Sequence, residues 1–152
     1  MGLPNGGAAM ETEDLVRLAT GAEAAGLDSV GVITTAAGIR RAARIADGLH
    51  PYRTDAGQLA ADIALFRSAA ADAGRDPAAL PVVLRGDAVL DPAAGRDRPL
   101  FRGTVAQWAE DAARVADLGV GHLVLQVDAP VEAALAALHD LRSRSADARP
   151  VP

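Results

Sequence analysis

The chain has 152 residues, half of them hydrophobic but only 3% aromatic, which predicts one domain whose core consists mainly of alanine, leucine and valine. Its 15 basic residues are all arginine, its formal net charge is −5 and no block of like charges occurs, so nucleic acid is not an expected partner. Cysteine is absent, no apolar run approaches the roughly 20 residues of a membrane span, and a secretory signal pattern is missing, so we expect a cytoplasmic protein without disulfides or a membrane partner.

Helical and strand-like segments alternate along the sequence. Amphipathic periodicity predicts helices over residues 12–26, 36–46, 55–74, 104–119 and 130–143. Thr104 is the expected N-cap of the fourth helix, and Gly74 and Gly119 are expected to end the third and fourth. Apolar runs predict strands over residues 27–33, 81–90 and 121–127, a brief extended piece over 47–52, and a further strand if residues 1–5 pair. Residues 91–102 are expected to form a charged loop.

Connections of about two to six residues between such elements are typical of βαβ units around a parallel sheet. The pattern therefore predicts an α/β fold with about five parallel strands that alternate with helices. We expect one domain over residues 1–145, followed by a flexible tail over residues 146–152.

The stretch "VGVITTAAGIRRAARIADGLHPY", residues 30–52, runs from an apolar strand through a small polar turn into a basic helix. Backbone N–H groups at the start of such a helix lie at the positive end of its dipole, an arrangement that suits a phosphate. The hydroxyls of Thr34 and Thr35 would add donors, and Arg40 or Arg41 a positive charge. The same pattern is also typical of an ordinary N-cap before a solvated helix face, and neither GxGxxG nor GxxxxGK[ST] occurs.

Histidines and strand-end residues provide further candidates. His50 ends a short strand, where parallel α/β folds place ligands, so cofactor binding and an ordinary hydrogen bond to a nearby loop are both open. Arg85 and Asp87 follow an apolar strand segment, which makes them either pocket residues or partners in a rim salt bridge. The three histidines share no metal-ligand spacing, so the sequence predicts no metal site.

Several spaced blocks carry a family resemblance. "AAGIRRAARIADGLHPY", "FRSAAADAGRDPAALPVVLR" and "RGTVAQWAEDAARVADLGVGHLVLQV" follow one another over residues 34–128. In this order they resemble the C-terminal third of the luciferase-like monooxygenases, and most of all the branch that uses the deazaflavin coenzyme F420. The N-terminal "EDLVRLATGAEAAGLDSVGV" is similar to the start of the same family.

The resemblance implies a TIM barrel, which takes roughly 250 residues when complete. It therefore also implies that about four strands from the middle of the barrel are absent here, which leaves a partial TIM-barrel-like (β/α) unit. The glycine pair that precedes the helix in the family is replaced by Val32 and Ile33, whereas Thr34 and Thr35 match the family pattern. Removing strands from a barrel exposes sheet edges, so we expect a homo-oligomer, most simply a dimer.

For function, the resemblance implies an oxidoreductase that transfers hydride between F420 or FMN and a small organic substrate. The cofactor-binding residues it implies are Thr34, Thr35, Ala36, Ala37, Gly38, Arg41 and His50. No catalytic residue is predicted. Two alternatives stay open: a non-catalytic cofactor-binding or oligomerising module on the same scaffold, and an α/β domain in which the two threonines only cap a helix.

Overall fold

The computed structural model describes residues 35–128 and 131–147, and it divides the chain into residues 1–32 and 33–152. The predicted helix over 12–26, the strand over 27–33, the strand over 1–5, Thr34 and most of the predicted tail lie outside the described residues. The single domain over 1–145 therefore stays a prediction.

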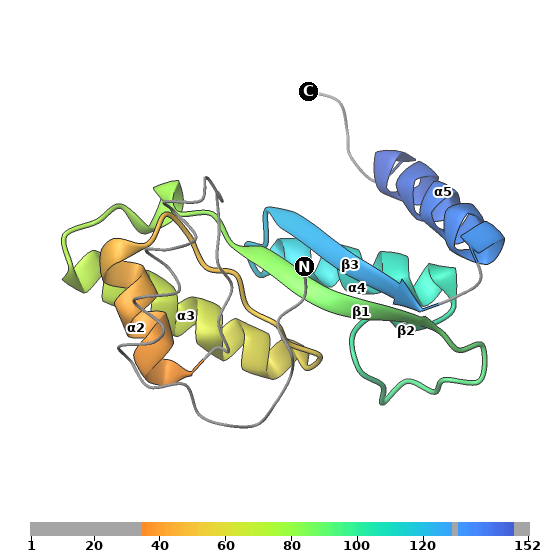
Figure 1. Cartoon of the computed structure of the whole chain (residues 1–152), viewed down its shortest axis with the longest axis horizontal. Coiled ribbons are helices and arrows are strands. Elements are labelled where there is room, and N and C mark those ends of the chain that lie inside the picture. The colour runs from red at the N-terminus through yellow and green to blue at the C-terminus, as the bar shows by residue number, and fades with distance from the viewer. Residues whose placement is uncertain (1–34, 129–130, 148–152) are drawn as a thin grey trace, which may run out of the picture. The chain divides into compact units, whose positions relative to one another are not determined.

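A parallel sheet forms the centre of the described unit (Figure 1). Its strands are β1 (Val83–Leu90), β2 (Arg102–Gly103) and β3 (His122–Asp128), in the order β2-β1-β3. Both pairings are parallel, with Val89 opposite Arg102 on one side and Asp87 opposite Gln126 on the other. The extended segment 49–52 joins the β2 edge of β1 through parallel bridges from Leu49 to Val82 and from Tyr52 to Arg85.

The parallel sheet and two of its strands confirm the prediction. The five predicted strands are not found, because the described residues contain a three-stranded sheet and one bridged segment. The prediction of a loop over 91–102 was wrong at its end. Arg102 lies in β2, where the N–H of Val89 donates to the carbonyl of Phe101 and the N–H of Asp91 donates to that of Gly103. A two-residue strand has no alternating pattern by which sequence reasoning could detect it.

The described helices are α2 (Ala36–Ile45), α3 (Ala56–Asp72), α4 (Val105–Asp117) and α5 (Val131–Asp147), with a short 3-10 helix, η1 (Pro77–Ala79), before β1. Helices α2 to α4 follow the predicted pattern closely, whereas α5 runs four residues past its predicted end at residue 143 and enters the predicted tail. Thr104 caps α4 in a reciprocal box with Gln107, as predicted. Gly74 and Gly119 have φ of 73° and 92° just beyond α3 and α4, which confirms both as helix-ending glycines. No helix of the described residues is long and apolar enough to cross a bilayer.

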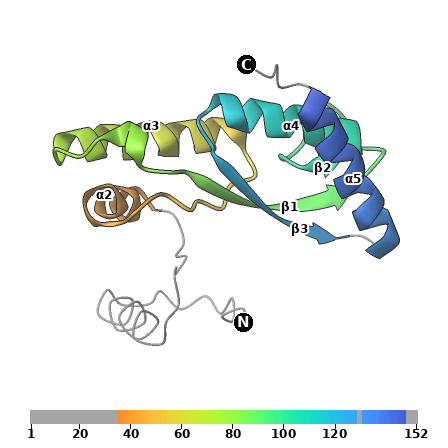
Figure 2. The ribbon, with the colours of Figure 1, turned by 90° about the horizontal axis from the view of Figure 1, so that it is seen from above.

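Helices α3 and α4 lie on the same face of β1 and β3 (Figure 2). Val82, which directly precedes β1, and Leu84 and Ala88 within it occupy alternate positions and are buried. The core that covers them includes large side chains from both helices and from the loop before β2: Leu59, Ile63, Phe66, Phe101, Trp108 and Val115. Segment 49–52, β1 and β3 are thus consecutive parallel neighbours with both connecting helices on one side, as in a (β/α) barrel; a doubly wound sheet has helices on both faces.

Candidate functional site

The sheet face that points away from α3 and α4 is rich in polar side chains. Side chains alternate along a strand and agree in direction with their register partners, so this face can be followed across the sheet. Arg85 and Asp87 share it with Tyr52, which pairs with Arg85, and with Gln126, which pairs with Asp87. Arg102 and Asp128, the two register partners of Val89, lie at its carboxyl end. In a (β/α) barrel the helices surround the strands, so the face opposite the helices lines the barrel interior, and ligands bind at the carboxyl end of the strands.

Tyr52 and Asp87 are in direct contact on this face. The phenol oxygen of Tyr52 lies 2.5 Å from Oδ2 of Asp87 and donates its proton to it. The backbone beside Tyr52 is held in place because the N–H of Arg85 donates to the carbonyl of Pro51, which is fully buried. Arg53, the next residue, forms an ion pair with Asp62 of α3, at 2.7 Å between Nε and Oδ2. The tyrosine ring therefore projects from a fixed stretch of backbone onto the sheet face that points away from α3 and α4, called the open face below.

The environment of Tyr52 raises its pKa above the ordinary value of 10.0. The largest cause is the hydrogen bond to Asp87, followed by burial and the negative charge of Asp87, while the positive charge of Arg85 acts in the opposite direction. A phenolate beside a carboxylate would place two negative charges together, which explains the sign. Tyr52 is 45% exposed, so its hydroxyl is accessible while it stays protonated at neutral pH.

The loop before β2 is anchored on α4. Arg98 forms a buried ion pair with Asp111, and the same carboxylate accepts the backbone N–H of Phe101 at 2.7 Å. Further along, Arg102 pairs with Asp91 at 3.0 Å between Nε and Oδ2, on the carboxyl side of β1. The carboxyl end of the sheet face therefore carries the Arg102–Asp91 ion pair, and the loop that leads to Arg102 is fixed to α4 by Arg98 and Asp111.

The predicted phosphate-binding turn begins α2. The hydroxyl of Thr35 accepts the N–H of Gly38 at 3.1 Å, which confirms Thr35 as an N-cap. Within the described residues, the N–H groups of Ala36 and Ala37 meet no hydrogen-bond acceptor, and both residues are exposed. Arg41 is also exposed, and the first turn contains no acidic residue. The donors at this helix end fit an anion, and no acidic side chain in the first turn opposes it.

His50 lies away from this turn. A ten-residue helix spans about 15 Å, and His50 follows the far end of α2, beyond its C-cap Ala46. Its side chain is exposed and alternates with the buried Leu49 and Pro51, so it shares the polar face with Tyr52. The structure thus divides the predicted cofactor residues into the α2 turn and the sheet face, and a joint role for them stays a prediction.

Sequence reasoning missed Tyr52 and misplaced two of its neighbours. The predicted strand over 81–90 is confirmed by β1, which continues to Leu90, so Arg85 and Asp87 lie within the strand and not at its end, where a pocket role would place them. No ion pair between them is recorded among the described residues, where Asp87 instead accepts the Tyr52 hydroxyl. The available signal for Tyr52 was its position two residues after His50 in an extended segment, which puts both side chains on one face.

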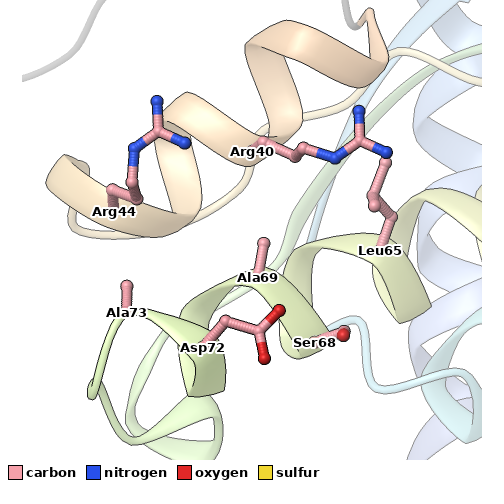
Figure 3. A pocket seen from close by; sticks show the side chains of 7 residues that line it. All are labelled: Arg40, Arg44, Leu65, Ser68, Ala69, Asp72 and Ala73. Atoms are coloured by element: carbon pink, nitrogen blue, oxygen red, sulfur yellow. The ribbon is translucent and has the colours of Figure 1, made fainter.

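Two other features of the described part bear on ligand binding. An open groove of about 380 Å³ lies between α2 and α3, with Arg40 and Arg44 on one side and Ser68, Ala69 and Asp72 on the other (Figure 3). It is a solvent-facing gap between helices and does not belong to the sheet face. Residues 35–128 and 131–147 contain no cluster of three or more His, Cys, Asp or Glu side chains that could hold a metal ion.

No family model and no curated protein matches the sequence. Among solved structures, the chain resembles an F420-dependent secondary alcohol dehydrogenase in complex with an F420-acetone adduct. The TM-score is 0.59 at 13% sequence identity. The shared region covers 72% of this chain and 46% of the dehydrogenase, so this chain corresponds to about half of that protein. At this identity the likeness establishes the fold: the chain is built like part of that enzyme.

Proposed function

We propose that this chain binds the deazaflavin F420 and takes part in hydride transfer between that cofactor and a small organic substrate. The observation that carries the proposal is the arc of consecutive parallel strands, with its helices on one face, that resembles an F420-dependent dehydrogenase at a TM-score of 0.59. The polar face opposite α3 and α4 supports it, because that face corresponds to the interior of the barrel.

The N-terminal turn of α2 would hold the cofactor phosphate. Its donors are the N–H groups of Ala36 and Ala37 and the hydroxyl of Thr35, which can still donate while it accepts from Gly38. Arg41 adds a positive charge on the same helix. When bound, the deazaflavin accepts or donates the hydride, and the residues of this chain bind and orient it.

Fluorescence titration with F420, and separately with FMN, tests the binding site. Thr35→Ser keeps both the cap and the hydroxyl, so F420 binding should match that of the unsubstituted protein. Thr35→Asp keeps the cap but places a negative charge where the phosphate would lie, so affinity should fall by about tenfold or more. Absence of F420 binding at about 100 μM would overturn the proposal, and equal affinity of Thr35→Asp would move the phosphate away from α2.

Cofactor binding without turnover is a second candidate. The observation that favours it is coverage, because the shared region accounts for only 46% of the dehydrogenase. Reduction of F420 in the presence of a simple secondary alcohol separates the two functions. Binding together with reduction supports the oxidoreductase, whereas binding alone supports a cofactor-binding module.

We also propose that the chain forms a homodimer. Within the described residues, no strand pairs with the outer edge of β3, and a second copy could cover that edge. Helix α5 also exposes the apolar side chains of Val131, Leu135 and Leu138. Sedimentation velocity should give a dimer, and a stable monomer at micromolar concentration would contradict this proposal.

A further inference from the structure

The hydrogen bond between Tyr52 and Asp87 joins segments 35 residues apart in the sequence. It lies on the open face, where Tyr52 is 45% exposed and Asp87 is half-buried. A hydrogen bond between groups that water can reach contributes little to stability, because water would satisfy both partners in the unfolded chain. The pair therefore places a phenol and a carboxylate at fixed positions on an accessible surface without being required by the core.

The direction of this hydrogen bond limits what Tyr52 can recognise. The phenolic proton is donated to Asp87, so the exposed side of the oxygen offers only lone pairs. A group that approaches Tyr52 from solvent must therefore supply its own proton. Among small organic molecules this favours a hydroxyl over a carbonyl, which has no proton to donate.

We propose that Tyr52 and Asp87 form a proton relay that accepts the hydroxyl proton of a small alcohol bound on the open sheet face. This inference rests on the proposed function, which supplies the deazaflavin as hydride acceptor. The alcohol O–H bond breaks as its proton moves to the Tyr52 oxygen, and the phenolic proton moves to the Asp87 carboxylate. The electron pair of the adjacent C–H bond leaves as hydride to the deazaflavin, a C=O bond forms, and Asp87 releases its proton to solvent. The alcohol is oxidised and the deazaflavin is reduced.

The surroundings of the pair are compatible with this role. Arg85 on β1 contributes a positive charge near Tyr52, and Gln126 of β3 is the uncharged register partner of Asp87. The other titratable groups of the face are His50, His122, Asp128 and the ion pair of Asp91 with Arg102. The raised pKa of Tyr52 keeps the phenol protonated at neutral pH, so the relay begins with a proton that Tyr52 can transfer.

The first test needs no cofactor. The chain contains one tyrosine, so the ultraviolet absorbance of phenolate reports on Tyr52 alone. We expect it to titrate above the ordinary value of 10.0, and Asp87→Asn to lower that pKa by removing the neighbouring charge. Asp91→Asn is the matched control. It removes a carboxylate that directly follows β1 and is not hydrogen-bonded to Tyr52, so it should leave the titration unchanged. Indistinguishable titrations of the unsubstituted protein and Asp87→Asn would overturn the relay.

The second test separates the relay from the proposed function. With F420 and a secondary alcohol, Tyr52→Phe and Asp87→Asn should each lower kcat by about a hundredfold while F420 affinity stays the same. In both variants kcat should also lose the pH dependence that proton transfer through Tyr52 and Asp87 gives the unsubstituted protein. Failure of the unsubstituted protein to bind F420 would overturn the proposed function. Normal F420 binding together with full turnover by Tyr52→Phe would overturn the relay alone. Normal F420 binding with no turnover by the unsubstituted protein would overturn both the relay and the proposed hydride transfer, and would leave cofactor binding as the function.

Discussion

Arg98 and Asp111 form an ion pair that is almost completely shielded from solvent. Nη1 and Oδ2 are 2.5 Å apart, and each side chain is 9% exposed. The same carboxylate accepts the N–H of Phe101, a buried residue in the left-handed region with φ of 61°. One side chain of α4 therefore holds both the cation and the backbone of the loop that leads into β2. The carboxyl end of the sheet face depends on this anchor.

Asp111→Asn should destabilise the protein by about 3 kcal/mol or more, because it leaves the buried Arg98 guanidinium without a counter-charge. Urea unfolding followed by the fluorescence of Trp108, the chain's one tryptophan, measures the change. Asp91→Asn is the matched control, since its partner Arg102 is 50% exposed and the loss should be about 1 kcal/mol or less. Equal losses in the two variants would contradict a special role for the buried pair.

Alkaline pH should destabilise the fold through Tyr52. Its pKa is higher in the folded chain than in the unfolded chain, so the unfolded state loses its phenolic proton first as the pH rises. The resulting stabilisation is fully present below the ordinary pKa of 10.0 and is lost as the pH rises through the folded pKa. As the pH is raised from neutral to above 10.0, the free energy of unfolding should fall more steeply for the unsubstituted protein than for Tyr52→Phe. Parallel pH profiles would show that the pKa is not raised in solution.

The cap of α2 can be tested independently of any cofactor. Thr35→Ala removes the acceptor for the N–H of Gly38 and should cost about 1 kcal/mol. Thr35→Asp should be at least as stable as the unsubstituted protein, because a carboxylate both caps the helix and interacts favourably with its dipole, and the first turn has no acidic residue. Thermal unfolding measures both variants. A large loss in Thr35→Asp would mean that weaker F420 binding by that variant reflects unfolding.

Gly48→Ala should destabilise the junction between α2 and the bridged segment. A Cβ at this position would lie 2.6 Å from the carbonyl oxygen of Pro81, the same oxygen that accepts the N–H of Leu49. Moving these atoms apart should cost about 1–3 kcal/mol. Gly95→Ala is the matched control, because a Cβ there meets nothing within 4 Å. Chemical denaturation of the two variants should differ clearly, and equal stability would contradict the close approach at Gly48.

The local pattern of the sequence was sufficient for most elements of the described unit. Helices α2, α3 and α4 begin and end within two residues of their predicted bounds, because caps such as Thr104 and glycines such as Gly119 act on neighbouring backbone groups. Strands β1 and β3 were recognisable as apolar runs between helices. The order of strands and helices also predicted a parallel sheet, since a strand–helix–strand unit allows that arrangement.

Contacts between segments far apart in the sequence could not be predicted in this way. The two residues of β2 follow a loop that the Arg98–Asp111 pair fixes to α4, and neither this contact nor the pairing with β1 leaves a local pattern in the sequence. The predicted strand over 81–90 contains Arg85 and Asp87, but only the register with β3 shows that both lie in the middle of the strand and not at the end of its apolar run.

The sequence by itself determined the helices and the two longer strands and offered Thr35 as one of two readings, a cap or a phosphate ligand, because each of these depends on residues within one or two turns of chain. Only the tertiary structure decided that Tyr52 lies against Asp87, that His50 lies beyond the far end of α2 from Thr35, and that the polar side chains share one sheet face. These relationships depend on strand register and on which side the helices cover, and both are set by burial of the Leu59, Phe66 and Trp108 side chains against β1.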